Sequence, residues 1–393
     1  MERFKNKWIS GLVPALLIHI CMGVIYCWSI IKADVAYAMQ CSTSEIEIAF
    51  SISLLCLGLT AAFVGRFVDY DVKLSTGIAG LFFVLGMGGS VVAINYGSPL
   101  MFIISYGVLQ GIGLGIGYIT PIKNLMMWFG EHRGVVIGLT LCMFGLSKIV
   151  FGPTISNMVD LHGVEYAMGY VTLIGFAGML IAKLFIDEPD ECCENFKTVS
   201  WKEIKSIVCD KKFASIWVMF LLNAMCGVAM VSYERTMMAD VGVHDISFWV
   251  MVAALSNVLG RFFVPIATLK TEHKSSSFIY IFFVCVLVTV FSLISFKPWS
   301  LLIMMMVVNF CYGGSFSALP VLLHERYGYK NLALIHGFML GAWAIGGFAG
   351  DMFADYLYRL LGEGGTVELI RKFFIFYMLA FIVTFRGFYT GKK

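Results

Sequence analysis

Charged residues are scarce in this sequence. They make up 13% of its 393 positions, whereas a soluble domain carries roughly 25% because its surface must be hydrated. Hydrophobic residues account for 59% of the chain, and its mean hydropathy is +0.85. The net charge of +3 is too small to indicate a nucleic-acid partner. The composition therefore excludes a soluble globular protein and predicts that the lipid bilayer surrounds most of the chain.

The sequence also lacks the motifs that hold metals, cofactors or catalytic nucleophiles. Its 11 cysteines contain no CxxC pair, and the adjacent Cys192 and Cys193 lie in an acidic stretch typical of solvated thiols. There is no HExxH motif and no nucleophile elbow. The alternating glycines from Gly111 to Gly117 lack the preceding strand and the following Lys-Ser/Thr of a phosphate-binding loop. We therefore expect close helix packing there, and no metal, no cofactor and no enzymatic activity.

Long apolar segments are what the sequence has instead. A helix needs about 20 apolar residues to cross the hydrocarbon of a bilayer. The first segment is long and lacks a small-residue cleavage pattern, so it predicts a span and not a cleavable signal peptide. We predict twelve spans, at residues 8–31, 45–64, 74–94, 100–128, 134–158, 165–186, 213–238, 246–269, 276–296, 299–326, 331–358 and 371–389.

A polar stretch divides these spans into two sets of six. It runs from Asp187 to Lys212, so we predict a six-helix bundle at 1–186, a cytoplasmic linker at 187–212 and a second six-helix bundle at 213–393. The halves share a repeat: four residues recur 199 positions later, Gly115, Pro121, Gly138 and Phe144 as Gly314, Pro320, Gly337 and Trp343. The predicted fold class is an all-α integral membrane protein with twelve transmembrane helices in two pseudo-symmetric bundles, a design typical of carriers.

The distribution of lysine and arginine predicts the orientation, because basic residues concentrate in cytoplasmic connections. If both termini are cytoplasmic, the outer connections hold only Lys32, Lys297, Arg359, Arg371 and Lys372. Arg371 and Lys372, in the last outer connection, are an exception to the pattern. We expect a multi-pass protein of the plasma membrane or the bacterial inner membrane, with both termini in the cytoplasm.

The connection after the second span has a recognisable pattern. Residues 65–73 contain Gly65, Asp69 and Lys73, and this spacing is similar to the Gly-x-x-x-Asp loop of the major facilitator superfamily. The resemblance implies that the glycine allows a tight turn and that the acid holds the cytoplasmic face closed. Only one basic residue ends the loop, and the corresponding loop of the second half has lost the pattern. Members of the superfamily are usually monomers, which we also expect here.

Several ordered fragments resemble the oxalate/formate antiporter family within that superfamily. In the first half they are Tyr26-Cys27-Trp28-Ser29, the glycine-rich stretch up to Tyr118, and Trp128-Phe129-Gly130-Glu131-His132-Arg133-Gly134. In the second half they are Asn257-Val258-Leu259-Gly260-Arg261 and Tyr312-Gly313-Gly314-Ser315-Phe316. The resemblance implies a transporter of small carboxylates and places Arg133 with Gly65, Asp69 and Lys73 at the cytoplasmic gate.

Two cations lie near the middle of predicted spans. Arg261 is in the eighth span and Lys148 in the fifth, where an ionised side chain costs several kcal/mol and usually faces a cavity or a partner. The sequence shows no acid at matching depth, so a cavity that binds an anion is one interpretation. The alternative is that each cation bonds helix carbonyls or a distant acid such as Glu234.

The family resemblance bears on both cations. In oxalate transporters of the family, the arginine of Asn-x-x-Gly-Arg and a lysine in the eleventh helix contact the dicarboxylate. Arg261 matches the arginine, but Trp343 stands at or near the lysine position. Lys148 lies one helical turn after Phe144, the repeat partner of Trp343. We hypothesise that Lys148 replaces the missing lysine and that Arg261 and Lys148 hold a small anion between the two halves.

Aromatic residues would complete such a site with apolar walls and hydroxyl donors. The candidates are Tyr26, Trp28, Tyr118, Tyr312 and Trp343, with Asn257 one turn from Arg261 and able to orient it. Ordinary helix packing is the alternative for each.

The predicted function is secondary active transport of small carboxylate anions by alternating access. Exchange of one anion for another is favoured over proton symport, because no titratable acid stands at the middle of the spans. The alternative function is that of a proton-coupled monocarboxylate symporter, for which Asp34 and Glu234 are the candidate acids. A further alternative is a sensor that binds the anion without transporting it.

Overall fold

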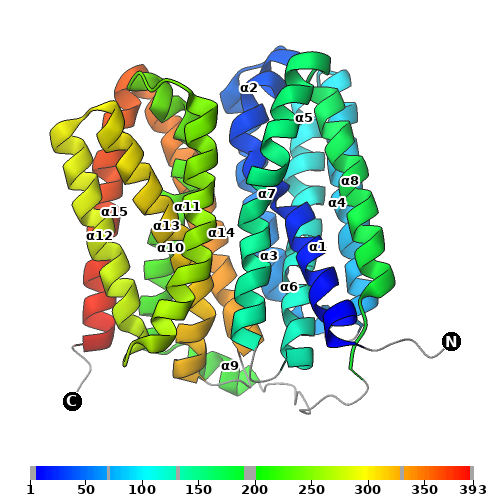
Figure 1. The fold of residues 1–393 in the computed structure, drawn as a ribbon, viewed down its shortest axis with the longest axis vertical. Helices are drawn as coiled ribbons and strands as arrows, with labels where there is room; N and C mark the ends of the chain where they lie inside the picture. The colour runs from blue at the N-terminus through cyan, green and yellow to red at the C-terminus, as the bar shows by residue number, and fades with distance from the viewer. Residues whose placement is uncertain (1–5, 69–70, 130–132, 190–200, 328–331, 390–393) are drawn as a thin grey trace. The chain divides into compact units, whose positions relative to one another are not determined.

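The computed structural model describes residues 6–68, 71–129, 133–189, 201–327 and 332–389. Every regular element within these ranges is a helix (Figure 1). The chain separates into two compact units, Met1–Cys193 and Glu194–Lys393. This division falls inside the stretch for which the sequence predicts a linker.

The first unit contains six long helical segments (Figure 1). The first segment is composite, because a 3-10 turn at Gly23–Cys27 separates α1 (Val13–Met22) from α2 (Trp28–Ala38), and a π-helical turn at Lys7–Leu12 precedes α1. The fourth is also composite and joins α5 (Pro99–Phe102), a π-helical stretch at Ile103–Leu109 and α6 (Gln110–Phe129). The others are α3 (Thr43–Val68), α4 (Val72–Asn95), α7 (Arg133–His162) and α8 (Val164–Phe185).

The second unit begins with a short helix and continues with six long ones. The short helix is α9 (Trp201–Val208). The long helices are α10 (Lys211–Asp240), α11 (Ile246–Lys270), α12 (Lys274–Ser295), α13 (Pro298–Tyr327), α14 (Leu332–Leu361) and α15 (Gly365–Tyr389), with a 3-10 turn at Gly362–Gly364 before the last.

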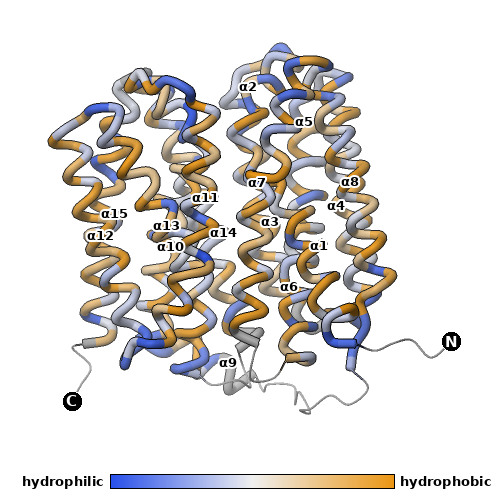
Figure 2. Tube along the Cα trace, in the orientation of Figure 1, coloured by the Kyte–Doolittle hydropathy of each residue, from blue (hydrophilic) through white to orange (hydrophobic). Residues whose placement is uncertain are grey.

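The long helices coincide with the twelve predicted spans. Among the described residues, ten helical segments are long and apolar enough to cross a membrane by length and composition. The remaining two are α14 and α15, with 30 and 25 residues. Their charged residues are Asp351, Asp355 and Arg359 in the second half of α14, and Glu368, Arg371, Lys372 and Arg386 in α15. Figure 2 shows that the bodies of the helices are mainly hydrophobic and that polar residues gather toward their ends.

Local sequence signals fix several helix ends. Ser42 and Glu45 form a capping box at the start of α3: the Glu45 carboxylate accepts from the Ser42 amide at 2.7 Å, and the Ser42 hydroxyl accepts from the Glu45 amide at 3.3 Å. The Asp71 carboxylate caps α4 by accepting from the Leu74 amide at 2.8 Å. Gly163, with φ of +96°, makes the turn between α7 and α8.

Two glycines set the closest helix approaches. A Cβ on Gly23 would collide with the carbonyl of Phe144, so the end of α1 lies directly against the backbone of α7. A Cβ on Gly260 would likewise collide with the carbonyl of Phe310, which brings α11 against α13. Small residues at such contacts are how helices pack closely in membranes. These two approaches position Lys148 and Arg261, as described below.

The α11–α13 approach makes a prediction about stability. We expect Gly260→Ala to lower the stability of the protein by about 1–3 kcal/mol, because the added methyl group meets backbone that cannot move aside. Gly341→Ala is the matched control, since a Cβ there would meet nothing within 4 Å in the described structure. Thermal unfolding of both variants in the same detergent measures the difference. Equal unfolding temperatures would contradict the close packing of α11 on α13.

Candidate functional site

The buried lysine of the first unit is held by the helix next to the 3-10 turn. Lys148 on α7 is 3% exposed, and its Nζ donates to the Oγ of Ser29 at 2.9 Å. Ser29 is the second residue of α2, immediately after the turn. The contact of Gly23 with Phe144 draws this part of the chain onto α7. The Lys148 ammonium is thus bonded to a neutral hydroxyl near the middle of the α7 helix.

Aromatic rings gather around Phe144, one turn before Lys148. Tyr26 packs edge-on against Phe144 with ring centroids 5.3 Å apart, and Tyr118 lies 6.0 Å away in the same manner. His19 completes the group, 5.4 Å from Tyr118 and 6.1 Å from Phe144. The structure therefore brings Tyr26 and Tyr118 to the region of Lys148. Phe144 was not among the predicted site residues, although its place in the repeat was an available signal.

Trp28 lies in a different group. Its ring stacks on Phe50 at 5.7 Å and also contacts Phe102 and Tyr106. Two residues along a helix are about 200° apart, so Trp28 and Tyr26 point to different neighbours.

The Trp28 group contains an acid that the sequence analysis did not single out. Glu47 is 1% exposed, and its Oε1 accepts a hydrogen bond from Trp28 Nε1 at 3.0 Å. Its Oε2 lies 3.2 Å from the Nζ of Lys32, which is also buried. Because Glu47 is only the third residue of its predicted span, sequence position suggested an exposed helix end.

The buried arginine of the second unit has an ordered environment. Arg261 on α11 is 1% exposed, and its Nε donates to the Oδ1 of Asn257 at 2.9 Å. Asn257 in turn donates through Nδ2 to the carbonyl of Asn309 at 3.2 Å. The guanidinium carbon lies 5.1 Å from the centre of the Phe316 ring, a cation–π distance. One edge and one face of the guanidinium are thereby fixed.

Phe316 connects Arg261 to the two other aromatic candidates. Trp343 on α14 meets Phe316 edge-on at 5.8 Å, and its Nε1 donates to the hydroxyl of Tyr312 at 2.8 Å. Arg261, Asn257, Tyr312 and Trp343 thus belong to one group in the second unit. Sequence reasoning missed Phe316, although it lies one helical turn after Tyr312 and on the same side of α13.

The loop candidates are only partly described. Gly65 lies within α3, and Asp69 lies outside the described residues. Lys73 is in the first turn of α4. Arg133 begins α7, but its side chain is outside the described part of the structure. Asp34 is half-buried on α2, and Glu234 is buried on α10.

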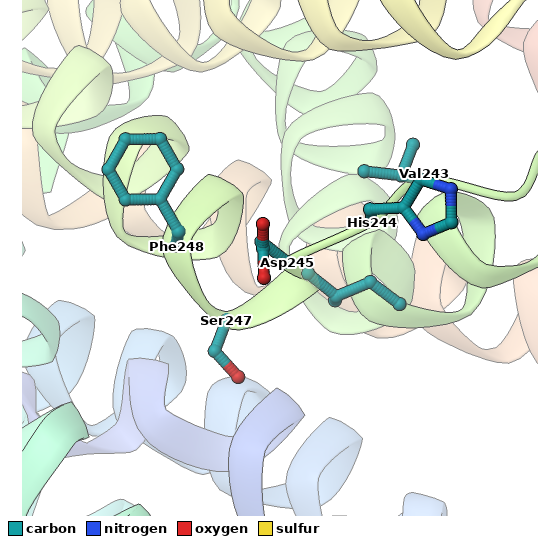
Figure 3. A pocket seen from close by; sticks show the side chains of 6 residues that line it. Val243, His244, Asp245, Ser247 and Phe248 are labelled. Atoms are coloured by element: carbon teal, nitrogen blue, oxygen red, sulfur yellow. The ribbon is translucent and has the colours of Figure 1, made fainter.

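A surface hollow in the second unit lies away from these groups. Figure 3 shows it at the connection between α10 and α11, where His244 and Phe248 flank Asp245. Its residues are mostly exposed, and Arg235 on α10 reaches it by donating to the Ser247 hydroxyl at 3.0 Å. We therefore do not assign it to the site that contains Arg261.

Two all-helical units with buried cations inside long apolar helices define a polytopic membrane transporter. The sequence matches the Major Facilitator Superfamily over residues 15–386, so the chain belongs to this superfamily. Its members are membrane transporters of small molecules and not enzymes. The resemblance to this superfamily and the predicted fold class are thereby confirmed.

Individual relatives are distant but cover almost the whole chain. The oxalate:formate antiporter of Oxalobacter formigenes is 24% identical over 97% of this chain and 93% of its own. An uncharacterized MFS-type transporter of Escherichia coli (strain K12), YhjX, is also 24% identical, over 87% of this chain and 86% of its own. The E. coli xylose transporter XylE, in a partially occluded inward-open structure, has the same fold, with a TM-score of 0.74 at 12% identity over 99% of this chain and all of its own.

The neutral partner of Arg261 makes a prediction about anion binding. An aspartate at position 257 would place a carboxylate 2.9 Å from the Arg261 Nε and compete with any bound anion for the guanidinium. We expect Asn257→Asp to raise the KM for carboxylate uptake into proteoliposomes about tenfold or more. Asn95→Asp at the exposed end of α4 adds the same charge away from both groups. A KM for Asn257→Asp equal to that of the control would show that Arg261 does not bind the substrate.

Proposed function

We propose that the protein exchanges small carboxylate anions across the membrane by alternating access. Arg261 and Lys148 bind the carboxylate, while Tyr26, Tyr118, Tyr312 and Trp343 provide the walls and hydroxyl donors around it. Asn257 orients Arg261. Trp28 has a supporting role in this proposal, because it holds Glu47 and packs on Phe50.

One observation carries the proposal: each unit contains a buried cation, Lys148 or Arg261, beside aromatic rings and far from the ends of a long helix. Lys148 bonds to a serine hydroxyl and Arg261 to an asparagine amide. An ionised group at bilayer depth costs several kcal/mol. A carboxylate relieves that cost, and arginine binds it with paired hydrogen bonds while lysine acts as a compact charge.

The same electrostatics favour exchange. If the site reorients empty, two buried cations must pass through an apolar surrounding without a substrate beside them, whereas a bound anion accompanies them at lower cost. After it releases its substrate, the carrier then reorients to the first side of the membrane fastest when a second anion is bound, and this is exchange. The likeness to an oxalate:formate antiporter supports small carboxylates as the substrate class, while the replacement of a lysine by Trp343 leaves oxalate itself in doubt.

The orientation and state of the protein are part of the proposal. We place both termini in the cytoplasm, in the plasma membrane or the bacterial inner membrane, and we expect a monomer. Gly65, Asp69, Lys73 and Arg133 form the cytoplasmic gating motif. Four of the five basic residues assigned to the outer connections have acidic partners that offset their charge: Lys32 with Glu47, Arg359 with Asp355, and Arg371 and Lys372 with Glu368.

The test is uptake by the purified protein in liposomes. Labelled formate, oxalate, lactate and pyruvate are each offered with and without unlabelled anion inside, and with and without a proton gradient. We expect uptake of at least one of these acids to require internal anion. Measurable binding without any uptake would instead favour a sensor on the same fold.

The two cations make a prediction within this assay. We expect Lys148→Ala and Arg261→Lys each to lower the exchange rate at limiting substrate about tenfold or more, because one loses a charge and the other its paired donors. Lys183→Ala removes an exposed lysine from α8 of the same unit and should leave exchange unchanged. If Lys148→Ala exchanges as well as Lys183→Ala and keeps the substrate preference, Lys148 is not part of the site.

Glu47 favours a second candidate, proton-coupled monocarboxylate symport. It is a buried carboxylate that could take up a proton, and it is held by Lys32 and Trp28 in the same unit as Lys148.

Under the exchange proposal, Glu47 supports the structure and does not carry protons. We expect exchange by Glu47→Gln to stay independent of a proton gradient, as in the unmodified protein. Uptake driven by a proton gradient without internal anion, and abolished by Glu47→Gln, would replace exchange with symport. Lys32→Gln, which breaks the same ion pair and leaves the acid, is the control for loss of the pair alone.

A further inference from the structure

The short helix α9 has no counterpart among the long helices of the second unit. It ends at Val208, and only Cys209 and Asp210 separate it from α10. The Asp210 carboxylate accepts a hydrogen bond from the Tyr327 hydroxyl at the end of α13, at 3.3 Å, and Phe213 packs edge-on against the Tyr327 ring at 6.4 Å. The joint between α9 and α10 is therefore anchored to the ends of two membrane-spanning helices. Since α9 is about 12 Å long at 1.5 Å per residue, the whole helix stays close to the membrane surface.

The sequence of α9 is amphipathic. With 3.6 residues per turn, Trp201, Ile204, Ile207 and Val208 occupy one side of the helix, and Lys202, Glu203, Lys205 and Ser206 occupy the other. Val208 is 39% exposed and Ile207 is half-buried, so the described end of the apolar side is only partly covered by the protein. A short amphipathic helix at a membrane surface lies in the plane of the interface with its apolar side among the headgroups and acyl chains.

The charge around α9 is positive. Residues 197–212 contain five lysines, at 197, 202, 205, 211 and 212, against two acids, Glu203 and Asp210. Lys205 is exposed on the polar side of the helix. Lysines beside a membrane surface attract anionic headgroups, each contributing about 1 kcal/mol, or roughly a fivefold change in binding.

We propose that α9 is an interfacial helix that binds the headgroups of anionic phospholipids. At the described end of the helix, Ile207 and Val208 enter the headgroup region and Lys205 contacts the phosphates, while Lys202 adds a second positive charge to the same short helix. Helix α9 is then held at the bilayer in proportion to the content of anionic lipid. This proposal is independent of the transported substrate, because it depends only on α9 and its connection to α10.

The test uses a fluorescent probe on the intact protein in liposomes. Cys209 is exposed beside α9, and Cys41, Cys56, Cys192 and Cys193 are replaced by serine so that an environment-sensitive dye labels Cys209. Emission is compared in phosphatidylcholine vesicles with and without phosphatidylglycerol. We expect a blue shift in the anionic vesicles that high salt reverses. Lys202→Gln/Lys205→Gln should lower the ratio of surface-bound to detached probe roughly 25-fold, a factor of about five for each lysine.

The control variant Lys270→Gln/Lys393→Gln removes the same charge elsewhere and should keep the shift. Val208→Asn should weaken the shift in anionic vesicles, since it removes apolar side chain from the interface. The proposal is overturned if the emission is the same in both kinds of vesicle, or if Lys202→Gln/Lys205→Gln keeps the full shift. A blue shift that depends on the density of the protein in the vesicles and not on lipid charge would overturn the proposal, because it would show that the apolar side of α9 binds a second copy of the chain.

Discussion

The cost of burying positive charge among apolar helices is the constraint on which this structure depends. Lys148 and Arg261 are 3% and 1% exposed, and each lies far from the ends of a long helix. The surrounding chain is arranged to give each cation a polar partner: the 3-10 turn after Gly23 delivers Ser29 to Lys148, and the helical spacing of α11 delivers Asn257 to Arg261. These hydrogen bonds hold each cation in place, and in our proposal an anionic substrate binds beside them.

The repeat in the sequence corresponds to a shared framework and not to shared polar groups. Phe144 and Trp343, which are 199 residues apart, each lie among aromatic rings in their own unit. The cations differ, because Lys148 is on the same helix as Phe144, whereas Arg261 is on α11 and Trp343 on α14. The two units therefore share aromatic packing at the repeat positions and carry their cations on helices at different places in the unit. Such a division suits a carrier whose two units move as rigid bodies while the side chains at the site specialise.

The sequence was sufficient for features that depend on chain spacing. Length and hydropathy predicted the helices, and the four-residue separation of Asn257 and Arg261 predicted that they would meet. Contacts between helices could not be predicted from the sequence, because they depend on how α11, α13 and α14 pack. Examples are the contacts of Trp343 with Tyr312 and of Arg261 with Phe316. Trp28 and Tyr26 were both predicted as aromatic walls of one site, although residues two apart on a helix face different ways. Glu47 was overlooked because its position near a helix start gave no sign of burial.

The central claim is that a small carboxylate neutralises the two buried cations, and thermal unfolding of the purified protein with and without ligand tests it most directly. A ligand at 100 times its Kd stabilises the folded state by about 2.7 kcal/mol. The account predicts that a saturating small carboxylate raises the unfolding temperature of the unmodified protein and has little effect on Lys148→Ala/Arg261→Ala. Equal stabilisation of both proteins, or stabilisation by cationic solutes in place of carboxylates, would contradict it.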